Sequence, residues 1–425
     1  MSTRVESRRL PVPEPALTPD EILARARALQ PRLREEQDAT ERRGTYSPSL
    51  HEEFRKAGFY RCLQPRRFGG YEFHLKTFFA LAVELARGDP SAAWCLILGA
   101  GHALTLGSYF DEQAQAESFG PDGEFRAPCV AAPTGTATPA EDGWVINGTW
   151  AYASGAPYAT HFMPSVLISA NEPGKTLPGL GVLPKSQFKM LDDWGAILGM
   201  RGSGSNSIKV ENARVPLNHV VQMDMLDVDV SEGTPGSRLH GNAMYAGRCA
   251  SFFHGELLSL MVGLGYAALD EYENIIRTRN TLFPPIGPRY LNADYQRSLG
   301  LALGMISAAK RLALHAGETY MEYCRRGFEG GEPFSLMEDL ELFASLEHGG
   351  RLVWEAVEMM FRTANTSAAK DGQRMQRYYR DISIYRGHIS AQYESIAQRL
   401  ALVYLGIATG ASTRRRASTK APPIR

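Results

Sequence analysis

The sequence predicts an α+β fold that is mainly helical, with an N-terminal helical domain, a central small β-barrel or sheet, and a C-terminal four-helix bundle. Three observations carry this prediction. The first 120 residues read as helices, residues 125–220 fall into short alternating runs broken by Gly, Pro and Asn, and helical periodicity returns beyond Tyr245 in four long blocks. The expected units are a disordered N-terminal segment, the helical domain, the β-domain, the bundle and a disordered basic tail, at residues 1–17, 18–122, 123–222, 240–408 and 409–425.

The first helix is expected to begin after Thr18. Thr18 can cap the helix, Pro19 suits its first position, Glu21 completes a capping box, and the helix should run to about Arg43. Further N-terminal helices are expected from Ser47-Pro48, over 75–87, and from Asp89-Pro90 through Trp94, His102 and Leu106. The four later blocks are expected near 246–279, 294–325, 336–362 and 374–407.

Two segments of the β-region are the most informative in the chain. Residues 143–155 alternate apolar and polar side chains around Asn147 and Gly148, which predicts a strand, a tight turn and a second strand. Residues 194–206 form a glycine-rich turn, and residues 208–216 again read as a strand. The residues that pack around this β-unit should therefore determine the function.

Composition restricts the class of protein. The chain has 425 residues and a formal net charge of zero, so it is expected to be a globular protein with neither a nucleic-acid nor a membrane partner. Its charged, proline-bearing start predicts no secretory signal, and no uninterrupted apolar run approaches membrane-spanning length. The five cysteines lack C-x-x-C spacing, which favours reduced, structural thiols in a cytoplasmic enzyme.

Several common site motifs are missing or misplaced. Residues 172–176 suggest a phosphate-binding loop, but Ser169 stands where its first glycine is required. Residues 263–268 imitate a dinucleotide fingerprint inside a helical block, so close helix packing explains them better. No H-E-x-x-H motif, Cys/His cluster or G-x-S-x-G motif occurs, so no metal site is expected and a hydrolase is not supported.

The last helical block carries a polar stripe. Tyr378, Asp381, Tyr385, His388 and Gln392 recur at spacings of three and four, beside an apolar stripe. A polar stripe next to a buried one is typical of a cavity or an interface. The alternative is that His388 simply hydrogen-bonds to Tyr385 or Asp381 in the bundle core, and periodicity alone favours that alternative.

Four short motifs, in this order, carry a family resemblance. They are residues 89–94, 148–155 and 199–205, and Arg380-Asp381 followed by His388. From about Thr18 to Leu405 the chain resembles the acyl-CoA dehydrogenase superfamily. It is most similar to the two-component flavin-dependent monooxygenases that share this fold, such as 4-hydroxyphenylacetate and secosteroid hydroxylases, dibenzothiophene monooxygenase and sugar N-oxygenases. Residues 131–137 lack the acid typical of true dehydrogenases, and residues 363–367 lack their usual catalytic glutamate.

The resemblance also implies roles for individual residues. Ser154 and His388 would be the catalytic groups, with the Ser154 hydroxyl near flavin N5 and His388 activating or orienting the substrate. Arg279 would approach the flavin phosphate across a subunit boundary. The implied cofactor-binding residues are Tyr152, Ala153, Ser154, Arg279, Thr366, Ser367 and Gln392, and the implied substrate-facing residues are Trp94, His102 and His388. Ala391 stands where some relatives carry an aspartate, so a mechanism that needs this acid is not expected.

The implied function is that of an oxygenase component. A separate NAD(P)H-dependent flavin reductase would supply reduced FMN, with FAD as a possibility, and O2 would react to give a C4a-hydroperoxyflavin that hydroxylates a phenolic or polycyclic aromatic molecule. Three alternatives stay open: N-oxygenation of an amine, flavin oxidation of the acyl-CoA dehydrogenase or oxidase type, and a noncatalytic relative. The resemblance further implies a homotetramer.

Overall fold

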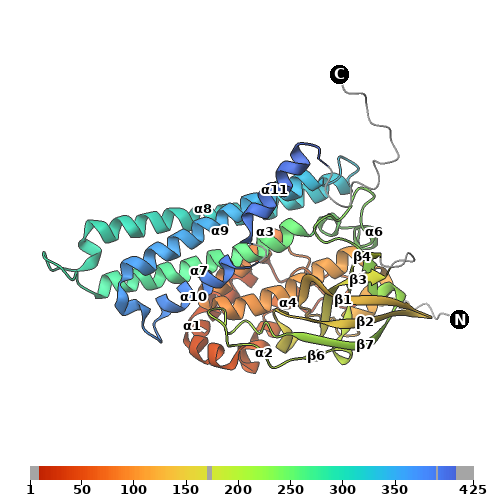
Figure 1. Cartoon of the computed structure of the whole chain (residues 1–425), viewed down its shortest axis with the longest axis horizontal. Helices are drawn as coiled ribbons and strands as arrows, with labels where there is room; N and C mark the ends of the chain where they lie inside the picture. Colours follow the sequence, from red (N-terminus) through yellow and green to blue (C-terminus); the bar gives the residue numbers. More distant parts are fainter. Residues whose placement is uncertain (1–8, 170–174, 389–390, 408–425) are drawn as a thin grey trace, which may run out of the picture.

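The structure is a computed structural model that describes residues 9–169, 175–388 and 391–407. The long helices of the C-terminal half lie side by side, and the sheet lies at one end of the molecule beside α4 (Figure 1). The N-terminal helices α1 and α2 lie on the same side of the molecule as the sheet (Figure 1). The N-terminal helices are α1 Pro19–Arg43, α2 Pro48–Lys56, α3 Leu75–Gly88, α4 Pro90–Tyr109 and α5 Glu112–Phe119.

Helix starts follow the capping signals in the sequence. Thr18 and Glu21 form the predicted capping box at the start of α1, with Pro19 in its first turn. Asp89 precedes α4, and its carboxylate accepts hydrogen bonds from the backbone N–H groups of Ser91 and Ala92 at 2.9 and 3.2 Å. The orientation of α4, which carries Trp94, is therefore fixed at its N-terminus.

Residues 9–17, which the sequence assigned to a disordered segment, are held against the helical domain. The Leu10 backbone N–H donates to the Arg67 carbonyl at 2.9 Å, and Glu14 pairs with Arg25 at 2.6 Å. Leu17 is buried. Local composition could not reveal these contacts, because their partners lie in later helices and loops. Residues 1–8 and the expected tail 409–425 lie outside the described residues.

Over the described residues, the central sheet has eight strands in the order β6-β7-β2-β1-β3-β4-β8, with β5 pairing β3. β1 and β3 run parallel, and the other pairs are antiparallel. The fully buried Trp150 lies in a small apolar cluster that belongs to the sheet. The strands are β1 Cys129–Ala140, β2 Gly143–Trp150, β3 His161–Ser169, β4 Thr176–Gly181, β5 Leu183–Pro184, β6 Lys189–Met190, β7 Ile208–Pro216 and β8 Val220–Gln222.

The tight turn predicted around Asn147 and Gly148 is wrong. β2 continues through both residues, and the chain reverses instead between Ala140 and Gly143, which pair across the β1–β2 hairpin. The register between β2 and β7 shifts between Ile146 and Gly148, so the Asn-Gly pair forms an irregularity inside the strand. Neighbouring strands on both sides of β2 hold it extended, which overrides the local turn signal.

The C-terminal bundle differs from the prediction in its last helix. A single block over 374–407 was expected, but α10 ends at Arg386 and α11 begins at Tyr393. Gly387 follows α10 as its C-cap, and the low helix propensity of glycine favours a break there. His388 and Gln392 therefore do not share a continuous helical stripe with Asp381. The connecting and bundle helices are α6 Pro235–His240, α7 Ala250–Thr278, α8 Ala293–Phe328, α9 Leu336–Ala364, α10 Arg374–Arg386 and α11 Tyr393–Tyr404.

Helices α4 and α7 form the centre of the core. Both are long and apolar enough to span a membrane by length and composition, contrary to the expectation from the sequence, but 94% and 89% of their apolar windows are buried. This burial is typical of core helices. A Cβ at Gly263 of α7 would lie 2.5 Å from the Ala86 Cβ, so the glycines of segment 263–268 do permit close helix packing.

Candidate functional site

Two loops from the β-domain meet at the N-terminal half of α4. The Ala153 N–H donates to the Asn206 carbonyl at 3.2 Å, and the Ala156 N–H donates to the Gly204 carbonyl at the same distance. Gly155 has a φ of 90°, and a Cβ there would lie 2.9 Å from the Cys95 carbonyl oxygen of α4. Glycine is therefore required for this approach, which fixes the Ser154 side chain over α4.

The Ser154 hydroxyl lies at the end of a hydrogen-bonded series. The Trp94 indole N–H donates to Ser154 Oγ at 2.9 Å. Ser154 Oγ also lies 2.8 Å from Ser205 Oγ, which lies 2.7 Å from Ser203 Oγ. If Ser203 donates to Ser205 and Ser205 donates to Ser154, the Ser154 hydroxyl hydrogen stays available to donate to a bound molecule.

His388 also contacts Trp94. The two rings are 5.7 Å apart and meet edge to face, at an interplanar angle of 75°. Burial, with a smaller contribution from the charge of His254, lowers the pKa of His388 to about 4. The alternative that Tyr385 or Asp381 holds the His388 ring is not supported, since Asp381 Oδ1 accepts from the Met200 N–H, and Asp381 Oδ2 and the Tyr385 hydroxyl have no hydrogen-bond partner within the described residues. His388 is therefore neutral at pH 7 and able to accept a hydrogen bond.

His102 lies two turns beyond Trp94 on α4. Its Nδ1 donates to the Ala127 carbonyl at 2.7 Å, so this nitrogen carries the proton and Nε2 is the acceptor. Burial lowers the pKa of His102 to about 4. Its ring meets Phe253 of α7 at 5.5 Å. His102 therefore lies where α4 meets both α7 and the segment that leads into β1.

The glycine-rich loop is anchored on α10. The Met200 N–H donates to Asp381 Oδ1 at 2.5 Å, and the Arg380 guanidinium donates to the Leu198 carbonyl at 2.9 Å. Burial raises the pKa of Asp381 to about 6, against the opposing effect of the hydrogen bond from Met200. A Cβ at Gly199 would lie 2.2 Å from the Arg380 carbonyl oxygen, so loop and helix are in direct backbone contact.

The remaining predicted cofactor residues lie elsewhere. Arg279 follows α7 directly, and its guanidinium donates to Ser367 Oγ at 2.6 Å. Thr366 and Ser367 are the first two residues of the short helix Thr366–Ala369. The helical rise places Arg279 about 37 Å along α7 from His254, whose charge acts on His388. Gln392 is exposed and donates to the His388 carbonyl at 3.5 Å.

Tyr152 is an exposed residue among those predicted to contact the flavin. It has a left-handed backbone conformation, with a φ of 61°, and its side chain is 66% exposed. Its ring meets the Trp194 ring at 5.9 Å and 82°. The buried Trp194 Nε1 has no hydrogen-bond acceptor within the described ranges. An exposed aromatic ring beside an unsatisfied donor is suited to holding a planar, polar ligand.

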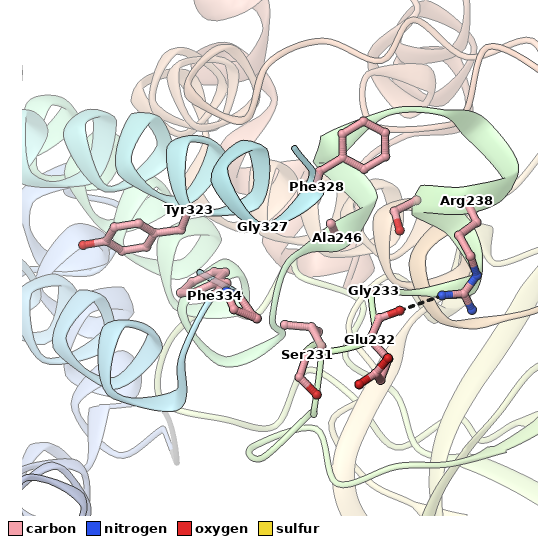
Figure 2. A pocket seen from close by; sticks show the side chains of 12 residues that line it. Ser231, Glu232, Gly233, Arg238, Ala246, Tyr323, Gly327, Phe328 and Phe334 are labelled. Carbon is pink, nitrogen blue, oxygen red and sulfur yellow. Dashed lines mark hydrogen bonds between the residues drawn. The ribbon is translucent and has the colours of Figure 1, made fainter. Parts of the chain in front are cut away.

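A surface pocket of about 330 Å³ lies in another part of the molecule. Tyr323, Phe328 and Phe334 line one side of it, and Arg238 donates to the Glu232 carbonyl on the other (Figure 2). It contains none of the residues that the sequence singled out. The predicted site is thus distinct from this pocket.

Sequence reasoning missed Ser205 and Ser203 as partners of Ser154. Both lie in the glycine-rich segment that was singled out for its turn character, and only their hydrogen bonds to Ser154 show a further role. It also missed the buried pair of His254 and Glu347, whose side chains are hydrogen-bonded between α7 and α9. Nothing in the local sequence marks this pair, because the partners are 93 residues apart.

Comparisons with known proteins agree with this architecture. Residues 257–393 match the family model described as acyl-CoA dehydrogenase, C-terminal domain. The oxygenase subunit HsaA of a flavin-dependent monooxygenase from Rhodococcus jostii is 25% identical over 86% of this chain and 93% of its own length. The oxygenase component of an FADH2-dependent resorcinol hydroxylase from a Rhizobium species is 23% identical over 83% of this chain and 86% of its own.

A solved structure shows the same fold. The crystal structure of 3-HSA hydroxylase from Rhodococcus sp. RHA1 superposes with a TM-score of 0.83 at 22% identity, covering 92% of this chain and 98% of that one. The helix–sheet–bundle order, the loops over α4 and the sequence relatives agree. The chain is thus similar to acyl-CoA dehydrogenases over residues 257–393 and to flavin-dependent monooxygenases over most of its length.

Proposed function

We propose that this chain is the oxygenase component of a two-component monooxygenase, which takes reduced flavin from a separate reductase and hydroxylates an aromatic small molecule. The observation that carries the proposal is the convergence of Ser154, Trp94 and His388, from the β-domain, α4 and the end of α10. A hydroxyl donor and a neutral imidazole both contact one indole ring. The relatives named as oxygenase components support the two-component arrangement.

The residues present fit a flavin. Ser154 can direct its own hydrogen at a ring nitrogen, and Trp194 Nε1 is a buried donor without an acceptor within the described chain. Tyr152 offers an exposed aromatic face beside Trp194. Reduced flavin, when bound, supplies the electrons that activate O2. FMN is the preferred form, with FAD as the alternative, and O2 is the co-substrate.

His388 serves to position the substrate. Its low pKa, about 4, keeps the imidazole neutral at pH 7, so a ring nitrogen can accept the hydrogen bond of a phenol hydroxyl, which orients the phenol and adds electron density to its ring. The edge-to-face contact with Trp94 orients the imidazole ring. The buried surroundings of Trp94 exclude water from the same place.

Arg279 and Ser367 would hold the flavin phosphate of a neighbouring subunit. Arg279 lies about 37 Å along α7 from His254, whose charge acts on His388, and this separation exceeds the length of a flavin nucleotide. The loop after Arg279 also exposes large apolar side chains, including Phe283 at 81% and Leu282 at 66% exposure. Both features support an assembly of several copies, and we infer a cytoplasmic homotetramer served by an NAD(P)H-dependent reductase.

Stopped-flow absorbance tests the proposed function. The protein and anaerobically reduced FMN are mixed with oxygenated buffer, and a transient near-ultraviolet band should appear before the visible bands of oxidised flavin. The buried surroundings of Trp94 should exclude water from the site and so delay these bands. A return of oxidised flavin at the rate measured without protein would contradict the proposal and favour a dehydrogenase or a noncatalytic relative.

Replacement of Arg279 should weaken flavin binding. Arg279→Ala removes a charge-assisted contact to phosphate, so the Kd for reduced FMN should rise roughly 10- to 100-fold in an anaerobic titration. Arg277→Ala is the matched control, because this exposed guanidinium lies two residues earlier and pairs with Glu273. If the Arg279 and Arg277 variants bound reduced FMN with equal affinity, Arg279 would not be part of the flavin site.

A further inference from the structure

Glu256 on α7 is a buried acid without a partner. Its exposure is 0%, and neither carboxyl oxygen has a hydrogen-bond partner within the residues described. Burial raises the pKa of Glu256 well above the usual range, and no neighbouring cation opposes that effect. A buried, unpaired carboxyl group costs free energy, since it loses its hydration and gains nothing in return. A ligand that donates hydrogen bonds to the Glu256 carboxyl group would offset this cost.

The carboxyl group lies against the backbone of α4. A Cβ at Gly101 would be 1.6 Å from Glu256 Oε1 and 2.8 Å from Glu256 Cδ, so only glycine leaves room for it. Gly101 directly precedes His102, and Phe253, one helical turn before Glu256, meets the His102 ring at 5.5 Å. Glu256 therefore shares the α4–α7 contact with His102.

This contact continues the site around Trp94. Leu98 and Phe253 are both partly exposed, although the residues around them on α4 and in the first half of α7 are buried. On α4, Leu98 lies one turn after Trp94 and one turn before His102, so the three share one helix face. Glu256 thus lies about 10 Å along α4 from Trp94, as judged by the seven-residue rise to Gly101.

We propose that Glu256 binds a basic nitrogen on the substrate, at the end remote from the ring that is hydroxylated. This inference rests on the proposed function and adds the substrate class: an aromatic molecule that carries an amine. The ligand would supply the cation that the protein does not place near this carboxyl group. Glu256 releases its proton when the ammonium group binds, and the resulting buried ion pair is held by charge-assisted hydrogen bonds.

Equilibrium binding without flavin tests the inference. Tyramine and 4-ethylphenol, which share the phenol ring and differ in the amine, are titrated into the whole protein by calorimetry. Tyramine should bind roughly 10- to 100-fold more tightly than 4-ethylphenol, and Glu256→Gln should abolish that difference. Glu256→Asp, which keeps the acid on a shorter side chain, should retain part of it.

Proton linkage gives a second measurement on the unmodified chain. Because a proton leaves Glu256 on binding, tyramine affinity should rise about tenfold per pH unit below the carboxyl pKa, whereas 4-ethylphenol affinity should not. A purely structural Glu256 would produce neither the pH dependence nor the difference between the two phenols. Equal affinities for both phenols at every pH would overturn the inference.

The outcomes separate this inference from the proposed function. A protein that shows the flavin transient but no preference for tyramine keeps its monooxygenase function and loses the amine specificity. A protein that prefers tyramine without the transient keeps the binding role of Glu256 and loses the oxygenase function. The pH series needs no variant, so it decides the question even if Glu256→Gln does not fold.

Discussion

Replacing His388 with alanine should lower hydroxylation roughly 100- to 10,000-fold while the transient near-ultraviolet absorbance band still forms. The imidazole is expected to hydrogen-bond to the substrate hydroxyl, and Ser154, Trp94 and Trp194 remain in place to hold the flavin. Product yield by chromatography and the stopped-flow transient measure the two steps separately. The His388→Ala variant is therefore expected to activate oxygen normally but to hydroxylate the substrate poorly.

The pH profile provides an independent readout of the same role. Because burial lowers the pKa of His388 to about 4, the imidazole is neutral above pH 5 and becomes protonated only as the pH falls through about 4. Hydroxylation should therefore show no His388 inflection near the ordinary histidine value of about 6.5. It should fall on the acid side, since the protonated imidazole cannot accept a hydrogen bond from the substrate hydroxyl.

A matched histidine on the surface serves as the control. His315 lies on α8 with its side chain 78% exposed, so His315→Ala should leave both hydroxylation and the transient unchanged. If His388→Ala instead lost the transient and the product in equal measure, the residue would act on the flavin or on the fold. The substrate-directed role of His388 would then be wrong.

Replacing Gly199 with alanine should destabilise the protein by about 1–3 kcal/mol and weaken flavin binding. The new methyl group would lie 2.2 Å from the carbonyl oxygen and 2.4 Å from the carbonyl carbon of Arg380, and helix backbone cannot move aside. The loop must then separate from α10, which breaks the hydrogen bond between Met200 and Asp381. Ser205, farther along this loop, would no longer support Ser154.

Thermal unfolding and an anaerobic flavin titration measure the two effects. Gly300→Ala on α8 is the matched control, because its Cβ meets nothing within 4 Å and alanine is the better helix former. This control should gain about 0.5–1 kcal/mol. A Gly199 variant that unfolds at the wild-type temperature would show that contact between the glycine-rich loop and α10 is dispensable.

The sequence correctly predicted helix starts that depend on residues close together in the chain. The capping box of Thr18 and Glu21 and the cap at Asp89 were read correctly because each involves a side chain and a backbone group within three residues. The turn predicted at Asn147 and Gly148 failed for the opposite reason. Pairing of β2 with strands on both sides determines its course, and those partners are remote in sequence.

The sequence by itself determined the order of helices, sheet and bundle, the helix starts, and the residues Trp94, Ser154 and His388 as candidates. Periodicity did not show that α10 ends before His388, because the apolar spacing continues past Gly387, where the helix breaks. It also could not show that the length of α7 separates Arg279 from the part of the site near His254. Nor did Glu256 stand out, since an acid becomes unusual only when packing buries it against Gly101. Tertiary structure decided these features because burial, hydrogen-bond satisfaction and distance depend on residues that meet only in the folded chain.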